Sequence, residues 1–101
     1  MALYVMLTKL TPEGSKSLSA TPDRVREVNQ EVLEFGCKLI GQYALIGPYD
    51  FLNLVEAPDN ETVAVLSASL ASRGTLEALT MPALNVGDIL GRLKAVRAGQ
   101  H

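Results

Sequence analysis

The sequence has few of the residues that build disulfides and metal sites. Cys37 is the only cysteine and His101 the only histidine among 101 residues. One cysteine cannot form a disulfide within the chain, and neither residue belongs to a spaced set of metal ligands. A reactive thiol needs a basic neighbour that the sequence does not specify, so Cys37 is expected to be a small buried apolar group. No metal site is expected.

Other signals are missing as well. No apolar run reaches the roughly 18 residues of a membrane helix, and no basic region precedes the apolar start, so neither a membrane span nor a secretion signal is expected. The absence of a glycine-rich phosphate loop argues against a nucleotide cofactor, and we expect no cofactor of any kind. The 9 basic and 11 acidic residues are scattered, without the basic stripe of nucleic-acid binders. The cytoplasm is the expected location.

Apolar residues, by contrast, are abundant for so short a chain. They make up 48% of the sequence. The length suits one domain, residues 1–101, and leaves no room for a second core. A domain of this size buries only about two-thirds of the surface of its unfolded chain. The apolar surplus therefore needs a cover, which is either a second copy of the chain or a bound ligand.

Four segments are predicted to be strands, because residues that fit a pleated sheet alternate along them. Along residues 2–10 both faces are apolar, which is typical of a strand covered on both sides. Residues 47–50, Gly-Pro-Tyr-Asp, are predicted to form a tight turn of an antiparallel hairpin in which Tyr43 faces Leu54. The predicted strands span residues 2–10, 37–46, 51–57 and 75–84.

Three helices are predicted from apolar residues at helical spacing. The first begins at residues 21–23, Thr-Pro-Asp, where a hydroxyl cap, a proline at the first helical position and an acid coincide. Asp59 or Asn60 is expected to cap the second, and the third spans residues 85–97. Residues 11–15 are expected to be an irregular turn.

The resulting order, β-α-β-β-α-β plus a C-terminal helix, predicts an α+β, ferredoxin-like fold with a four-stranded antiparallel sheet. Right-handed crossovers place the two main helices on the same face of the sheet. The opposite face is then apolar and uncovered, which is unusual for a monomer. A second sheet related by a twofold axis is the simplest cover, so we expect a homodimer or a larger homo-oligomer.

Five segments of the sequence form a recognisable pattern: YVMLTKLT at 4–11, KLIGQY at 38–43, GPYD at 47–50, FLNLVEAPD at 51–59 and RGT at 73–75. With these segments the sequence resembles the GYD domain family over nearly the whole chain. One departure is Pro48, which stands where arginine or another ordinary residue is common and which stiffens the turn.

The resemblance implies a member of the dimeric α/β-barrel superfamily, in which two ferredoxin-like sheets face each other. Relatives in that superfamily include small monooxygenases, isomerases, decarboxylases, stress-responsive proteins and ligand-binding regulatory modules. The GYD family itself is largely of unknown function. The resemblance therefore favours the fold and the dimer, and it says little about chemistry.

Four residues are candidates for chemistry: Tyr43, Tyr49, Asp50 and Glu56. Tyr49 and Asp50 would exchange protons with a substrate at a pocket mouth, or else Asp50 accepts bonds from turn amides while Tyr49 covers the end of the sheet. Tyr43 and Glu56 share a strand face, where a buried carboxylate would act as a base. The alternative leaves Glu56 solvated or paired with Lys38.

Three functions stay open on these grounds. The first is a homo-oligomeric module that binds a small apolar or aromatic molecule. The second is an assembly module whose C-terminal helix joins dimers into larger oligomers. The third is a cofactor-independent isomerase or monooxygenase that acts on a small ring compound, and it requires the four candidate residues to converge on one cavity.

Overall fold

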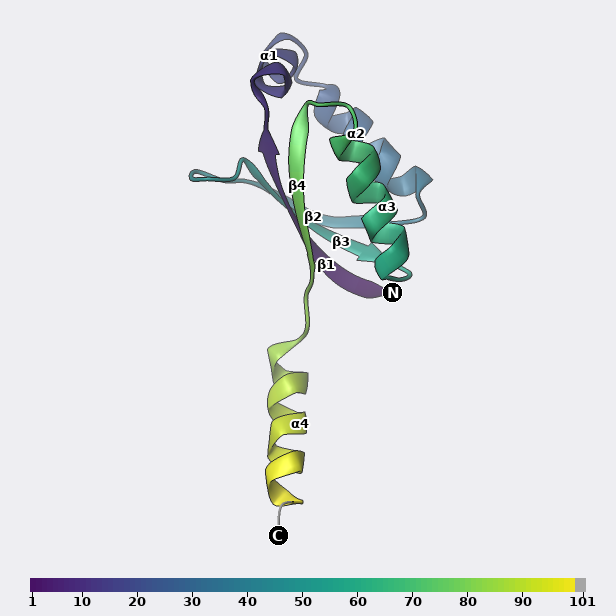
Figure 1. Cartoon of the computed structure of the whole chain (residues 1–101), viewed down its shortest axis with the longest axis vertical. Coiled ribbons are helices and arrows are strands. Elements are labelled where there is room, and N and C mark those ends of the chain that lie inside the picture. The colour runs from purple at the N-terminus through teal and green to yellow at the C-terminus, as the bar shows by residue number, and fades with distance from the viewer. Residues whose placement is uncertain (100–101) are drawn as a thin grey trace.

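The computed structural model describes residues 1–99 and has one four-stranded antiparallel sheet, in the order β2-β3-β1-β4, with four helices (Figure 1). The strand order and the two helices that follow β1 and β3 give the predicted ferredoxin-like α+β fold. None of the helices within residues 1–99 combines the length and hydrophobicity needed to cross a membrane. The elements are β1 (Ala2–Leu10), α1 (Pro12–Ala20), α2 (Arg24–Glu34), β2 (Lys38–Ala44), β3 (Phe51–Ala57), α3 (Asn60–Ala71), β4 (Leu76–Pro82) and α4 (Val86–Ala98).

The central strand, β1, is covered differently on its two faces. It pairs with β3 on one side and with β4 on the other, so that Val5 lies between Leu54 and Met81. Side chains alternate along it, with Tyr4, Met6 and Thr8 buried and the residues between them less buried. The predicted strand 2–10 is confirmed, and its alternation separates a helix-covered face from an open one.

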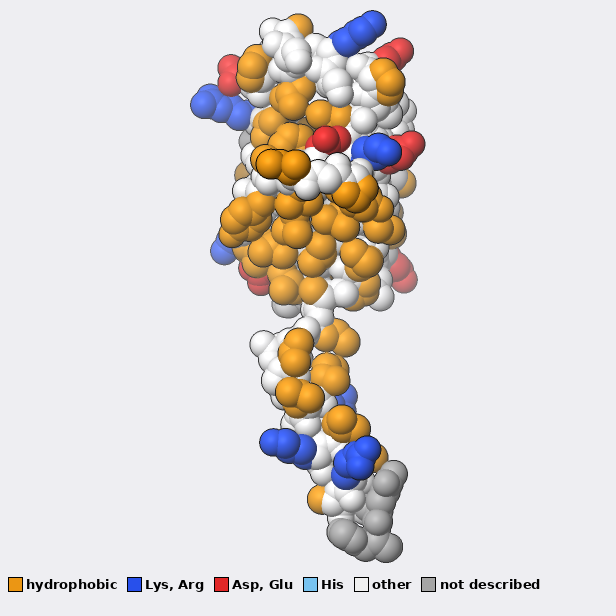
Figure 2. Space-filling model, turned by 90° about the vertical axis from the view of Figure 1, so that its left-hand side faces the viewer, with side chains coloured by type: hydrophobic (Ala, Val, Ile, Leu, Met, Phe, Trp, Pro, Cys, Tyr) orange, Lys and Arg blue, Asp and Glu red, His pale blue; other side chains and the backbone are white. Residues whose placement is uncertain are grey.

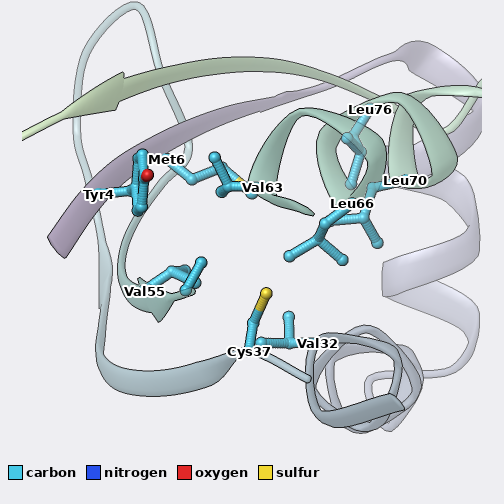
Figure 3. Close-up of a cluster of buried hydrophobic side chains, with 10 residues drawn as sticks. Tyr4, Met6, Val32, Cys37, Val55, Val63, Leu66, Leu70 and Leu76 are labelled. Atoms are coloured by element: carbon cyan, nitrogen blue, oxygen red, sulfur yellow. The ribbon is translucent and has the colours of Figure 1, made fainter. Parts of the chain in front are cut away.

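The hydrophobic core lies between the sheet and the helices α2 and α3, which cover the same face (Figures 1 and 3). Leu66 of α3 and Val55 of β3 are fully buried, at 0% exposure. Cys37 is 4% exposed, as expected for a small apolar group. Burial raises the pKa of the Cys37 thiol, and the charge of Asp59 adds to this, so the thiol stays protonated and unreactive.

The prediction of an irregular turn after β1 is wrong, because residues 12–20 form the helix α1. Its start is capped by the Thr11 hydroxyl, which accepts a hydrogen bond from the Gly14 N–H over 3.1 Å, and Pro12 occupies the first turn. The helix is mostly polar, and Gly14 is its buried residue. Without an apolar stripe, periodicity could not reveal it.

The start of α2 also differs from the prediction. Thr21 ends α1 and donates its backbone N–H to the Ser17 carbonyl, over 2.9 Å, instead of capping the next helix. Asp23 precedes the first residue of α2 and makes no side-chain capping bond. The helix itself is confirmed. At α3 the predicted cap is confirmed, since Asp59 accepts the Thr62 N–H over 2.8 Å.

The hairpin between β2 and β3 is looser than predicted. Tyr43 faces Leu52 rather than Leu54, because β2 ends at Ala44 and residues 45–50 form a six-residue loop. The Leu45 N–H still donates to the Asp50 carbonyl, over 2.8 Å, but the Asp50 N–H donates to Thr8 of β1, over 2.9 Å. Since β1 takes that N–H, the loop cannot close as a tight turn.

The C-terminal helix, α4, leaves the body of the molecule (Figure 1). It is confirmed close to its predicted bounds, and Asn85 caps it by accepting the Asp88 N–H over 3.2 Å. Because α4 continues the direction of β4, the molecule measures 63 × 29 × 19 Å. No residue of α4 is buried, so the helix does not take part in the hydrophobic core.

Candidate functional site

A small cavity lies on the helix-covered side of the sheet. It has a volume of about 110 Å³ and is bounded by α1, α2, the end of α3 and residues of all four strands. Its walls combine apolar groups, such as Val28 and Phe51, with a set of side-chain amides. Pockets for small ligands usually measure about 300–1,000 Å³, so this space is below the size of a typical ligand site.

Three amides form a chain of hydrogen bonds along the wall of this cavity. The Gln42 Nε2 donates to Asn53 Oδ1 over 2.9 Å and to Asn29 Oδ1 over 3.2 Å. The Asn53 Nδ2 donates to the Met6 carbonyl over 3.0 Å. This amide ladder joins α2, β2, β3 and β1, and it satisfies polar groups that burial would otherwise leave unpaired. It was not predicted, although strand alternation already placed Gln42 and Asn53 on the same face.

Near the cavity, Glu31 and Arg73 form an ion pair that ties α2 to the end of α3. The Glu31 side chain is only 10% exposed, whereas Arg73, which also lines the cavity, is 49% exposed. The Glu31 Oε2 has no hydrogen-bond partner among the described residues. Because the pair joins α2 to the segment that follows α3, a structural role for both charges is favoured.

The four predicted candidate residues lie away from this cavity, since none of them is among its lining residues. Tyr43 is 58% exposed on the open face of the sheet. Tyr49 and Asp50 are half-buried in the hairpin loop, where Asp50 Oδ2 accepts the Leu10 N–H over 2.7 Å. Glu56 lies opposite Lys38 in the register of β2 and β3.

The structure does not bring these candidates together. Tyr43 faces Leu52, and Glu56 lies four residues further along β3, which corresponds to roughly 13 Å of extended strand. Asp50 uses its carboxylate to hold the backbone of β1. An acid and a base that act on one substrate need to lie within hydrogen-bond reach of it, and this spacing separates Tyr43 from Glu56.

The second candidate site is the open face of the sheet, which no helix covers (Figure 1). Register places the apolar side chains in rows across the strands, with Leu7 between Leu52 and Leu79 and, next to it, Val5 between Leu54 and Met81. The outer residues remain accessible, at 43% for Leu79 and 39% for Met81. Figure 2 shows hydrophobic side chains gathered over this face.

Charged residues border the apolar rows at both ends of the strands. At one end Lys38 lies opposite Glu56, and at the other Lys9 lies opposite Glu77. An apolar centre with a charged rim is typical of a protein–protein interface. We call this surface, formed by β1 to β4 opposite α2 and α3, the open sheet face.

Among residues 1–99, no group of three or more His, Cys, Asp or Glu side chains lies close enough together to hold a metal ion. The only histidine, His101, lies outside the described residues.

Comparisons with known proteins give one family and two relatives. A family model described as GYD domain matches residues 4–91. The glutamine synthetase and cystathionine beta-lyase binding protein of Thermus thermophilus is 45% identical over 95 residues, which cover 93% of this chain and 100% of that protein. The crystal structure of TTHA0845, also from Thermus thermophilus, has a TM-score of 0.56 at 20% identity, over 85% of this chain and 96% of the other. This last likeness concerns the fold alone.

Proposed function

The chain belongs to the GYD domain family, and we propose that it is a homodimeric protein that binds an enzyme. The proposal rests on the Thermus relative, whose name states that it binds glutamine synthetase and cystathionine β-lyase and whose whole length aligns with this chain. These two enzymes are therefore the first partners to test. None of Tyr43, Tyr49, Asp50 and Glu56 lines the cavity between the sheet and the helices, which favours binding over catalysis.

The open sheet face supports the homodimer. A contiguous apolar surface of this kind is rare on a monomer and typical of an interface. Covering it with the same face of a second copy needs no other partner, and a twofold axis makes each apolar row complement its equivalent. We propose that the two open sheet faces pack against each other, as in the dimeric α/β-barrel superfamily, and we assign the protein to the cytoplasm.

The helix-covered side supplies the surface for the enzyme. With the open sheet face occupied by the second copy, the outer surfaces of α2 and α3 remain free. Each carries an exposed apolar side chain, Leu33 at 58% and Val65 at 57%. These exposed aliphatic groups are available for a contact with a protein partner.

Titration calorimetry with purified full-length protein tests this proposal. We expect saturable binding to glutamine synthetase or to cystathionine β-lyase, and none to an unrelated enzyme of similar size. Leu33→Glu and Val65→Glu should weaken the binding at least tenfold while the protein stays folded. Ala64→Glu, which adds the same charge at an exposed position of α3 about 100° around the helix from Val65, is the matched control. No detectable binding of either enzyme at about 100 μM would contradict the proposal.

A further inference from the structure

The helix α4 carries an apolar stripe that touches no core. Its members are 47–69% exposed, and all lie at helical spacing; they are Val86, Ile89, Leu90, Leu93 and Val96. Four of them, at positions 86, 89, 93 and 96, follow the alternating three-and-four spacing of a packing seam. Such a stripe on a helix without a neighbour marks a contact that a single chain does not provide.

A helix of this length needs that contact in order to persist. α4 has 13 residues, and it includes Gly87 and Gly91. Isolated helices of fewer than about 12–15 residues are marginal in water even when they are rich in alanine, and each glycine weakens them further. The Asn85 cap fixes where the helix begins but does not supply a packing partner. The sequence therefore specifies a helix whose stability comes from another surface.

Hydrophobic side chains of α4 are visible from the same side as the open sheet face. Figure 2, which looks onto that sheet face, also shows hydrophobic side chains along α4 below it. A partner that covers the sheet thus approaches from the side on which α4 presents its stripe. One partner can therefore contact both surfaces.

The accessible surface of the chain is large enough for both contacts. It measures 6914 Å², whereas a folded monomer of 10.8 kDa is expected to expose about 5,500 Å². The excess of roughly 1,400 Å² is greater than the ~800 Å² that each partner buries in a standard interface. An interface that includes α4 would lower the accessible surface of each protomer to the value expected for an ordinary folded protein of this mass.

Charge indicates which surface receives α4. Residues 85–101 hold three basic residues and one acid, Asp88, whereas residues 1–84 hold six basic and ten acidic residues. Two copies of α4 packed along their stripes would bring Arg92 and Arg97, which flank the seam, against like charges. The acidic body attracts the same residues. The charge distribution therefore favours contact between α4 and the body of another copy over contact between two copies of α4.

We propose that α4 is an exchanged arm, which packs its apolar stripe on the body of a second copy of this chain and directs Arg92, Lys94 and Arg97 toward the acidic surface of that copy. The inference rests on the homodimer of the proposed function and adds to it a second, reciprocal contact. The arm would add buried area to the interface that the two open sheet faces form.

Photo-cross-linking of the full-length protein tests the arm. A benzophenone amino acid replaces Leu93 on the stripe, and chains labelled with heavy nitrogen are mixed with unlabelled ones so that mass spectrometry separates products between chains from products within one chain. Ala95, on the opposite side of α4, is the matched control position. A benzophenone at Met81, on the open sheet face, reports the homodimer independently.

The expected product joins position 93 to residues 1–84 of another copy, at least fivefold more abundantly than position 95 does. Products between two α4 helices, or within one chain, would overturn the arm. The arm would also be overturned if added glutamine synthetase replaced the product between copies with one that joins position 93 to the enzyme. If position 81 cross-links between copies and position 93 does not, the arm fails and the homodimer stands. If neither does, the homodimer fails with it, while enzyme binding is decided by calorimetry.

Discussion

The carboxylate of Asp50 accepts a hydrogen bond from the backbone N–H of Leu10, with Oδ2 at 2.7 Å from the nitrogen. The Asp50 N–H completes the connection by donating to the Thr8 carbonyl over 2.9 Å. Together these bonds fasten the hairpin loop to the end of the central strand. The last residue of the Gly-Pro-Tyr-Asp segment thereby acquires a structural role that needs no substrate.

Replacing Asp50 should therefore lower stability. Asp50→Ala removes a charged acceptor from the Leu10 N–H, and we expect a loss of about 1.5–3 kcal/mol in the free energy of unfolding. Asp50→Asn keeps an acceptor oxygen and should lose less. Urea unfolding followed by circular dichroism measures both. Equal free energies of unfolding for the wild type and Asp50→Ala would show that the bond does not contribute to stability.

The amide ladder makes a second prediction. Gln42→Leu leaves the Asn53 Oδ1 without its donor in a buried setting, so we expect a loss of about 1–3 kcal/mol in the free energy of unfolding. Gln30→Leu is the matched control, because Gln30 is exposed on α2 and its replacement should change stability by less than about 0.5 kcal/mol. Similar effects of the two variants would argue against a structural ladder.

A third prediction concerns the packing of α1 onto the start of β4. A Cβ added at Gly14 would lie 1.8 Å from the Thr75 carbonyl oxygen, which is backbone and cannot move freely. Gly14→Ala should cost about 1–3 kcal/mol in stability. A Cβ at Gly91 in α4 meets nothing within 4 Å, so Gly91→Ala should stabilise by about 0.5–1 kcal/mol. Thermal melts that rank the two variants in the reverse order would refute this packing.

The cap of α3 makes stability depend on pH. Hydrogen bonds from the Thr62 hydroxyl and the Thr62 N–H hold the pKa of Asp59 below its ordinary value of 3.8. A carboxyl whose pKa is lower in the folded state stabilises above its unfolded pKa and loses this effect as the pH falls through the folded one. The melting temperature of the wild type should exceed that of Asp59→Ala at pH 7, and the gap should shrink below about pH 4. A gap that stays constant down to about pH 2 would be incompatible with this role.

The pattern of residues predicted the four strands, the helix α2, the helix α3 and the terminal helix. Alternation and helical spacing act through burial, which accounts for the strands, α2 and α3, whereas α4 has the spacing but no buried residue. The helix α1 was not predicted, because it has no apolar stripe. Its stabilisation is local, since Thr11 caps it, Pro12 lies in the first turn and Glu13 adds an acid there. The same three signals were assigned to residues 21–23, where Thr21 instead ends α1.

The site was harder to predict, because it depends on register and on long-range contacts. The pairing of Tyr43 with Leu52 follows from the Asp50 N–H bonding to β1, a contact 42 residues away in sequence that no local turn rule includes. The amide ladder likewise joins residues from four elements. Apolar alternation, in contrast, did predict an open sheet face, because it requires only the period of a strand.

The mass of the assembly tests the central claim, that a second copy covers the open sheet face. Native mass spectrometry at about 10 μM should give a dimer, at twice the protomer mass of 10.8 kDa. Met81→Glu, which adds a charge to the apolar rows, should shift the population to monomer, whereas Val65→Glu on the outer surface of α3 should leave the dimer intact. A wild-type protein found only as monomer would contradict the claim.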